Sequence, residues 1–141
     1  FGVFWRTWEN WASVSALLTA AEIKRGLTLG SLTGQEFFCF VEKGEEMETH
    51  LLREWVDRWM VGIVSLAWIV NPDRIVIGGG ISAQRKLLMP YLKAAFDAKM
   101  PAILTPHTTL SLAQFQNDAG MLGALYLYQQ RRQEGKNDLT F

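Results

Sequence analysis

The order of helical and strand-like segments along this 141-residue chain predicts an α/β fold. Three segments with helical periodicity precede a short β-branched strand, and a further helix, strand and helix follow, in the order α-α-α-β-α-β-α. Three consecutive glycines after the first strand indicate a tight turn into the next helix. Two strands are too few for an independent sheet of this class, so we expect part of the sheet to be missing.

The first half of the chain is predicted to be helical. Apolar residues recur near a 3.6-residue period over residues 8–24, which predicts a helix that ends at Gly26. A glycine-containing loop follows, and the apolar patch at residues 35–41 predicts a short helix. A long helix is expected over residues 45–70, and Asn71-Pro72 ends it, because the residue before a proline is pushed out of the α region.

The second half begins with the predicted strand at residues 74–77, whose apolar, mostly β-branched residues suit a sheet buried on both faces. Ser82 is the expected N-cap of the following helix. Pro90 is expected to kink or break that helix, or to begin a second piece of it. Residues 108–115 have moderate β-propensity and predict a second strand.

A last helix is predicted over residues 119–133, with Asp118 as its N-cap. It begins with a segment of small residues that includes Gly120 and Gly123. Glycine inside a helix costs roughly 1 kcal/mol relative to alanine, so two in one turn indicate a packing or ligand role. Residues 134–141 are read as a polar tail.

Six tryptophans make the chain unusually aromatic, and three of them fall in the long helix. Trp55 and Trp59 are four residues apart and share a helix face, and Trp68 follows in the same segment. Aromatic residues at helical spacing are more often core or interface than cofactor contacts. We therefore expect a packing surface here, with a subunit contact as one form of it.

Composition excludes several classes of function. Fourteen basic and fourteen acidic residues give a formal charge of zero, which argues against a nucleic-acid or membrane-surface role. Cys39 is the only cysteine, which excludes an intramolecular disulfide and indicates a cytoplasmic setting. The longest apolar run, residues 60–70, is too short for the roughly 20 residues that span a bilayer. Because the first residue is Phe1, we expect a piece of a longer protein.

The glycine run is the first candidate site. Gly78, Gly79 and Gly80 expose backbone N–H groups beside the positive end of a helix, which suits an anion such as a nucleotide phosphate. The run lacks the spacing of the dinucleotide-binding fingerprint and of the P-loop. The alternative is that the glycines only allow a strand to turn tightly into a helix.

Three segments of the chain share one family resemblance. They are WENWAS at residues 8–13, NPDRIVIGGGIS at residues 71–82 and AGMLGA at residues 119–124. In content, order and spacing they resemble the ROK family (repressor, open reading frame, kinase), which comprises sugar kinases and sugar-responsive repressors. The resemblance implies an actin-like, ribonuclease H-like ATPase fold, in which two lobes close over ATP and a sugar. Residues 1–133 would be a partial C-terminal lobe, and residues 134–141 its tail.

The resemblance also implies roles for particular residues. Glu9 matches the family's glutamate that accepts hydrogen bonds from sugar hydroxyls, and a carboxylate suits that task because it only accepts when ionised. The alternative is a first-turn acid favoured by the helix dipole. Gly78, Gly79 and Gly80 match the turn that lines the nucleotide pocket, for ATP with Mg²⁺ held mainly by parts outside this chain. The segment at 120–124 matches interlobe packing.

Departures from the family pattern limit what this chain is expected to do. Family kinases commonly carry a C-x-C-G-x-x-G-C zinc motif before the glutamate, and residues 2–8 hold no cysteine, so we expect no zinc. His50 and His107 lack ligand partners at metal spacing. The D-x-G-G-T loop, the catalytic aspartate and the E-x-G-H segment are also absent. Without a general base, this chain alone is not expected to turn over.

The leading interpretation is the C-terminal portion of an ATP-dependent sugar kinase that phosphorylates a hexose or amino-sugar hydroxyl. Its expected partners are the sugar, a missing N-terminal lobe and a second copy in a homodimer, with neither nucleic acid nor membrane. The alternative is the sugar-sensing lobe of a repressor of the same family, without catalysis. A third possibility is an inactive lobe that is retained for oligomer contacts through its tryptophan-rich helix.

Overall fold

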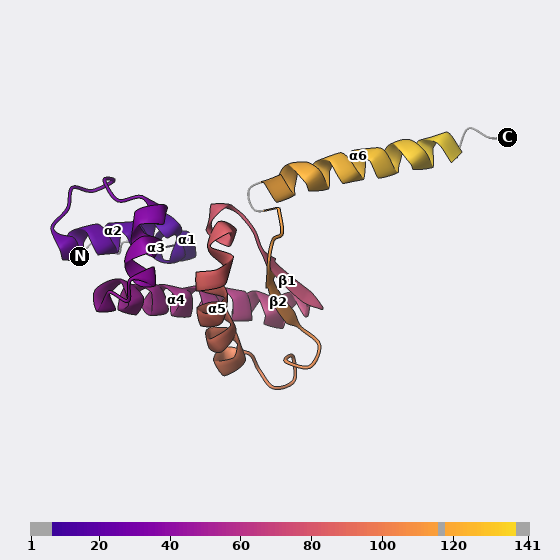
Figure 1. Ribbon diagram of the computed structural model, residues 1–141. Helices are drawn as coiled ribbons and strands as arrows, with labels where there is room; N and C mark the ends of the chain where they lie inside the picture. Colours follow the sequence, from indigo (N-terminus) through magenta and orange to yellow (C-terminus); the bar gives the residue numbers. More distant parts are fainter. Residues whose placement is uncertain (1–6, 116–117, 138–141) are drawn as a thin grey trace, which may run out of the picture.

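The computed structural model describes residues 7–115 and 118–137 (Figure 1). It confirms the α/β class and the predicted order of elements, except that the first predicted helix is divided in two and a 3₁₀ turn follows β1. Five α-helices, one short 3₁₀ helix and two strands precede the last helix. The elements are α1 (Trp8–Ala12), α2 (Val14–Arg25), α3 (Gly34–Glu42), α4 (Glu46–Val70), β1 (Arg74–Ile77), η1 (Gly80–Gln84), α5 (Arg85–Lys99), β2 (Thr109–Leu112) and α6 (Ala119–Asn137).

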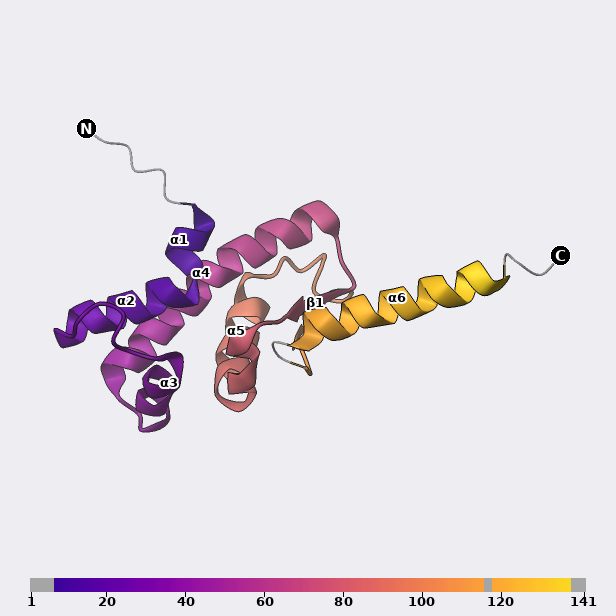
Figure 2. The same ribbon diagram turned by 90° about the horizontal axis from the view of Figure 1, so that it is seen from above.

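Helix α4, with 25 residues, is the element on which four other helices, α1, α2, α3 and α5, pack. Helices α1, α2 and α3 contact it, and α5 crosses it beside the two strands (Figures 1 and 2). The largest apolar side chains of the core are fully buried, and they come from α2, α3, α4 and α5. They include Phe37, Leu52, Trp55, Met60 and Leu92.

The predicted helix over residues 8–24 is divided in two at Ser13, so the prediction of one continuous helix was wrong. Ser13 is extended (φ −69°, ψ 158°), and its hydroxyl accepts a hydrogen bond from the N–H of Ala16 at 3.2 Å. A serine is a good N-cap, because its side chain satisfies a backbone donor that the first helical turn leaves free. The Ser13 carbonyl also accepts a hydrogen bond from the indole N–H of Trp55 at 3.0 Å. This bond ties the non-helical residue between α1 and α2 to a buried side chain of α4.

The two strands form a parallel pair, in which Arg74 lies opposite Thr109 and Ile77 opposite Leu112. Ile75 and Ile77 pack against the core on one face of the pair. On the other face Arg74 and Val76 are exposed, with Val76 56% accessible. The prediction of burial on both faces therefore fails in this chain, because no described element covers the outer face of β1.

The start of α5 differs from the prediction. Ser82 is not its N-cap, because a 3₁₀ turn (η1) comes first and α5 begins at Arg85 without a side-chain cap. Ser82 is instead buried within η1, and its hydroxyl donates to the carbonyl of Gly79 at 2.7 Å. Pro90 lies inside α5, and the helix continues through it to Lys99.

The three tryptophans of α4 lie on two different faces of the helix, one buried and one exposed. Trp55 is fully buried and its ring lies 4.4 Å from that of Trp59, centroid to centroid, as the helical spacing predicted. Trp68 is 58% exposed. Since 13 residues separate it from Trp55, it lies on the far side of the helix. The packing surface is confirmed for the first pair only.

Helix α6 extends away from the rest of the molecule in both views (Figures 1 and 2). It continues to Asn137, past the predicted end at residue 133. The capping role of Asp118 stays a prediction, because residues 116–117, directly before it, lie outside the described part. No helix in the part of the chain that the structure describes has both the length and the hydropathy of a membrane span. The apolar side chains that α6 exposes are Met121, Leu122, Leu125, Tyr126, Leu127 and Tyr128.

Candidate functional site

The glycine turn lies at the carboxyl end of β1, the edge of a parallel sheet at which ligands bind in open α/β folds. Gly79 has φ 84° and ψ −177°, a combination that only glycine adopts readily. Its carbonyl accepts both the N–H of Ser82 at 3.1 Å and the Ser82 hydroxyl. A Cβ atom added to Gly79 would meet no described atom within 4 Å, so the space directly beside the turn is open. The turn is therefore fixed by its backbone and accessible.

A cavity of about 480 Å³ lies next to this turn. Gly80 forms part of its wall, and residues from the start of α2, the start of α3 and η1 form the rest. Its lining combines apolar surface with three amide or hydroxyl side chains, which is typical of sites for small organic ligands. The other lining residues are Val14, Thr33, Gly34, Gln35, Phe38, Ile81, Ala83 and Gln84.

The start of α3 offers little to an anion, although it borders the cavity. Thr33 and Glu36 form a capping box, in which the Thr33 hydroxyl accepts the Glu36 N–H and the Glu36 carboxylate accepts the Thr33 N–H at 2.9 Å. The Thr33 hydroxyl and N–H also lower the pKa of Glu36, so its carboxylate is ionised near neutral pH. The capping box uses the N–H groups of Thr33 and Glu36, and it places a negative charge close to the cavity. This side of the cavity suits an uncharged group better than a phosphate.

The loop that leads into α3 is held by buried charge. Glu22, which is 1% exposed, accepts the N–H of Leu32 at 2.8 Å, and hydrogen bonds from the N–H groups of Leu32, Gly30 and Ser31 lower the pKa of its carboxyl group. Arg25 donates to the buried Glu48 at 2.5 Å. These contacts join the end of α2 to the α3 loop and to the first turns of α4. Through the α3 loop, these contacts hold in place the part of the cavity wall that Thr33 and Gly34 form.

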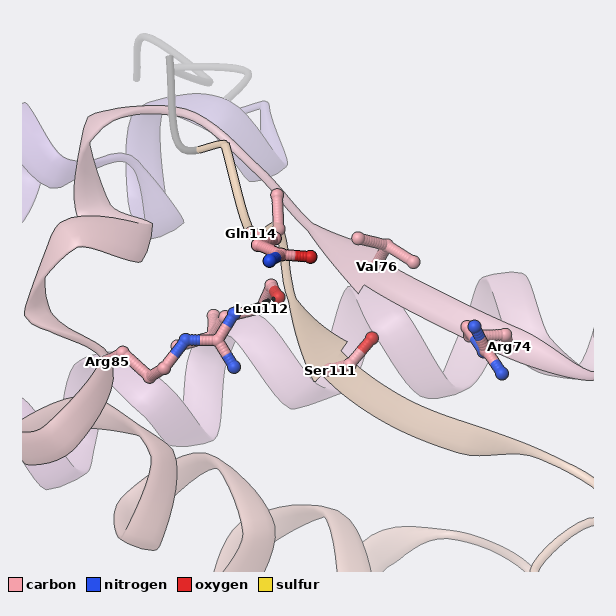
Figure 3. A pocket seen from close by; sticks show the side chains of 7 residues that line it. Arg74, Val76, Arg85, Ser111, Leu112 and Gln114 are labelled. Carbon is pink, nitrogen blue, oxygen red and sulfur yellow. Dashed lines mark hydrogen bonds between the residues drawn. The ribbon is translucent and has the colours of Figure 1, made fainter. Parts of the chain in front are cut away.

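A second cavity, of about 540 Å³, lies over the exposed face of the strands (Figure 3). The guanidinium of Arg85 extends toward the end of β2 and donates to the Leu112 carbonyl at 2.5 Å. Ser111 and Gln114 contribute the other polar groups, and Arg74 lies further along β1. Two cationic side chains thus face the open side of the sheet. This cavity is more polar than the one beside Gly80.

Glu9 is not part of either cavity. It lies in the first turn of α1, whose N-cap Thr7 accepts the N–H of Asn10 at 3.3 Å, and its side chain is exposed. The structure thus joins the glycine turn to the cavity and leaves Glu9 apart from it. Val14, five residues after Glu9, is the point at which the same chain segment reaches the cavity.

Sequence reasoning missed most of the cavity wall. Thr33, Gln35 and Phe38 precede the glycine turn by 40 residues or more, and no motif connects them to it. The closeness of α3 to η1 could not be read from local patterns. For metals, residues 7–115 and 118–137 contain no group of three or more His, Cys, Asp or Glu side chains placed to hold an ion. Most of the stretch on which the zinc expectation depends, residues 2–8, lies outside the described part.

Comparison with known proteins places this geometry in a family. Relatives include an uncharacterized protein of Clostridium perfringens (26% identical over 122 residues, 86% of this chain and 41% of the relative) and the beta-glucoside kinase of Listeria monocytogenes (29% over 105 residues, 74% and 34%). The chain therefore spans about two fifths or less of the length of these relatives.

The solved structures show the same fold. The ROK family glucokinase of Streptomyces griseus, in a crystal structure with glucose and AMPPNP, superposes with a TM-score of 0.71 at 22% identity, over 85% of this chain and 43% of that one. The chain thus has part of the actin-like fold of these sugar kinases. The model of the ROK family matches residues 6–131, and the chain belongs to the ROK family.

Proposed function

We propose that this chain is the C-terminal portion of an ATP-dependent sugar kinase, which transfers a phosphoryl group from ATP to a hydroxyl of a hexose or amino sugar. The observation that carries the proposal is the place of Gly80, in the wall of a 480 Å³ cavity at the carboxyl end of β1. Membership of the ROK family, together with a relative that is a beta-glucoside kinase, supports the same class of reaction.

In this proposal Gly78, Gly79 and Gly80 bind the nucleotide. The cavity takes the base and sugar of ATP, because its lining is partly apolar and the ionised Glu36 is hydrogen-bonded to Thr33 in its wall, which disfavours a phosphate there. The phosphates then lie on the open side of Gly79, where no described side chain obstructs them and backbone N–H groups are near. The turn geometry and the cavity chemistry support this orientation.

Glu9 is proposed to bind the sugar. Its carboxylate is exposed at the start of α1 and can accept two hydroxyl protons from one sugar ring. A first-turn acid favoured by the helix dipole would be exposed in the same way. Similarity to the family's sugar-binding glutamate favours the sugar.

The rest of the reaction is assigned to protein outside this chain. The described residues hold no cluster of ligands for a cation, so they do not fit a Mg²⁺ site of their own. A general base and most ligands of Mg²⁺ would come from the N-terminal lobe. We further propose that residues 1–133 are the partial lobe, that the protein is a cytoplasmic homodimer, and that neither zinc nor nucleic acid binds to this chain.

A test requires the full-length protein, ATP with Mg²⁺ and a panel of glucose, N-acetylglucosamine and a β-glucoside. Sugar-dependent release of ADP is expected with at least one of them. If sugars bind without ADP release and change the affinity of the protein for DNA, the chain belongs to a repressor. The alternative, a sugar-sensing lobe without catalysis, would then replace the proposal.

A further inference from the structure

Gly62 occupies a position in α4 that helix propensity does not explain. It lies in the interior of a 25-residue helix, where glycine is less favourable than alanine. A Cβ atom on Gly62 would come within 2.3 Å of Cε2 and 2.4 Å of Cζ2 of the Trp8 indole. Real Cβ atoms do not approach other atoms so closely. Gly62 therefore provides the surface on which the Trp8 ring lies.

The Trp8 ring is also held in place by a hydrogen bond. Its indole N–H donates to the carbonyl of Arg58 at 3.1 Å, one turn before Gly62. The same α1 helix places Trp11 under the guanidinium of Arg58, 5.6 Å from the ring centroid. A ring displaced from Gly62 would lose the Arg58 bond, because the indole is rigid and carries both contacts.

Helix α1 depends on these contacts. It has five residues, and helices of that length are not stable without tertiary packing. It lies against α4 in the view from above (Figure 2). Glu9 follows Trp8 directly in α1, so the contacts of Trp8 with α4 fix the backbone from which the Glu9 side chain extends.

We infer that the packing of Trp8 on Gly62 is the anchor that orients α1 and positions the Glu9 carboxylate for the sugar. Gly62 and Trp8 are positioning residues in this arrangement, and neither needs to touch a ligand. The inference rests on the proposed sugar-binding role of Glu9 for its functional part. Its structural part, the anchoring of α1, stands on the geometry alone.

The test uses Gly62→Ala in the full-length protein, with Ser65→Ala as the matched control. Ser65 is exposed on the same helix, and its hydroxyl only donates to the Val61 carbonyl. Hydrogen–deuterium exchange of the peptide over residues 7–13 reports on α1, and calorimetry reports sugar and AMPPNP affinities separately. Gly62→Ala is expected to speed exchange in this peptide and to raise the sugar dissociation constant about tenfold or more, with AMPPNP affinity unchanged.

Trp8→Ala supplies the second arm of a double-mutant cycle. It removes the ring that the methyl group added by Gly62→Ala would meet, so the double variant is expected to resemble Trp8→Ala alone instead of adding the two effects. It also keeps the test available if Gly62→Ala folds poorly. Additive losses in the double variant would contradict the anchor.

Two further results would overturn the inference. Unchanged exchange and sugar affinity in Gly62→Ala would show that the indole moves aside while α1 stays in place. Faster exchange with unchanged sugar affinity would show that α1 does not position the site. Glu9→Gln, made with Gly62 intact, separates the two levels of failure. If it weakens sugar binding while Gly62→Ala does not, the proposed function stands and the anchor fails.

Discussion

Substituting Gly79 by alanine tests whether the glycine turn depends on its backbone conformation. At φ 84° and ψ −177° a residue with a Cβ atom is strained, and residues held in such regions cost about 1–3 kcal/mol each. No steric term is added, since the new methyl group would meet no described atom within 4 Å. The whole loss of stability should therefore come from the backbone.

Gly78→Ala is the matched control, because Gly78 lies in the same turn and does not have a positive φ. Its added Cβ would lie 3.8 Å from the Cβ of Ala113, which is ordinary van der Waals contact. A glycine replaced at a compatible position stabilises a protein by about 0.4–1 kcal/mol, through the unfolded state. Because Gly79→Ala restricts the unfolded chain to the same extent, this gain cancels between the two variants, which should differ by the strain alone, about 1–3 kcal/mol, with Gly78→Ala the more stable.

The assay is equilibrium urea unfolding of the full-length variants, followed by far-ultraviolet circular dichroism. The expected order of unfolding midpoints is Gly78→Ala highest, then the parent, then Gly79→Ala. Equal midpoints for the two variants, or a Gly79→Ala variant as stable as the parent, would refute the assigned strain.

Four further outcomes are expected. Glu9→Gln in the full-length protein should weaken sugar binding by roughly 1.5–3 kcal/mol in calorimetry, since it removes a charged acceptor, and should leave ATP affinity unchanged; unchanged sugar affinity would return Glu9 to a helix-terminal role. Gly79→Val should raise the ATP dissociation constant and leave binary sugar binding nearly intact, whereas normal ATP binding with lowered stability would mean that the turn is only structural. The purified chain should hold no stoichiometric zinc in metal analysis after dialysis, because Cys39 is its only thiol, and one tightly held zinc would contradict that reasoning. Hydrogen bonds such as the one from the Leu32 N–H lower the folded-state pKa of Glu22 below 4.5, so the stability that they contribute is fully present above that pH and is lost as pH falls through the folded-state pKa. Glu22→Gln should therefore flatten the plot of unfolding free energy against pH on its acid side, and an unaltered slope would exclude Glu22 as its source.

Local patterns predicted the elements well where one residue type decides a boundary. Asn71 ends α4 in the left-handed region (φ 48°), before the proline that signalled the stop, and β1 spans the four residues predicted. The break at Ser13 was missed, because periodicity continues across it and the deciding contact comes from Trp55, 42 residues away. Contacts of that separation leave no local signal.

The candidate site shows the same division. The glycine turn was visible as three adjacent residues, and the structure places it at the end of β1 as predicted. The cavity beside it was not visible, because Phe38 and Gln84 reach it from segments that only the packing on α4 brings together. Ser82 was misassigned because a serine after glycines resembles an N-cap, whereas the 3₁₀ turn uses its hydroxyl inside the turn.

The most direct test of the central proposal is transfer of labelled γ-phosphate from ATP to glucose by the full-length protein, compared with Glu9→Gln. Glu42→Gln, which alters an exposed glutamate on α3, is the matched control. We expect labelled sugar phosphate from the parent and the control, and a loss of about 10- to 150-fold in kcat/KM for glucose in Glu9→Gln. Equal kcat/KM values in all three proteins would contradict a sugar-binding role for Glu9, and absence of labelled product with every sugar tested would contradict the kinase itself.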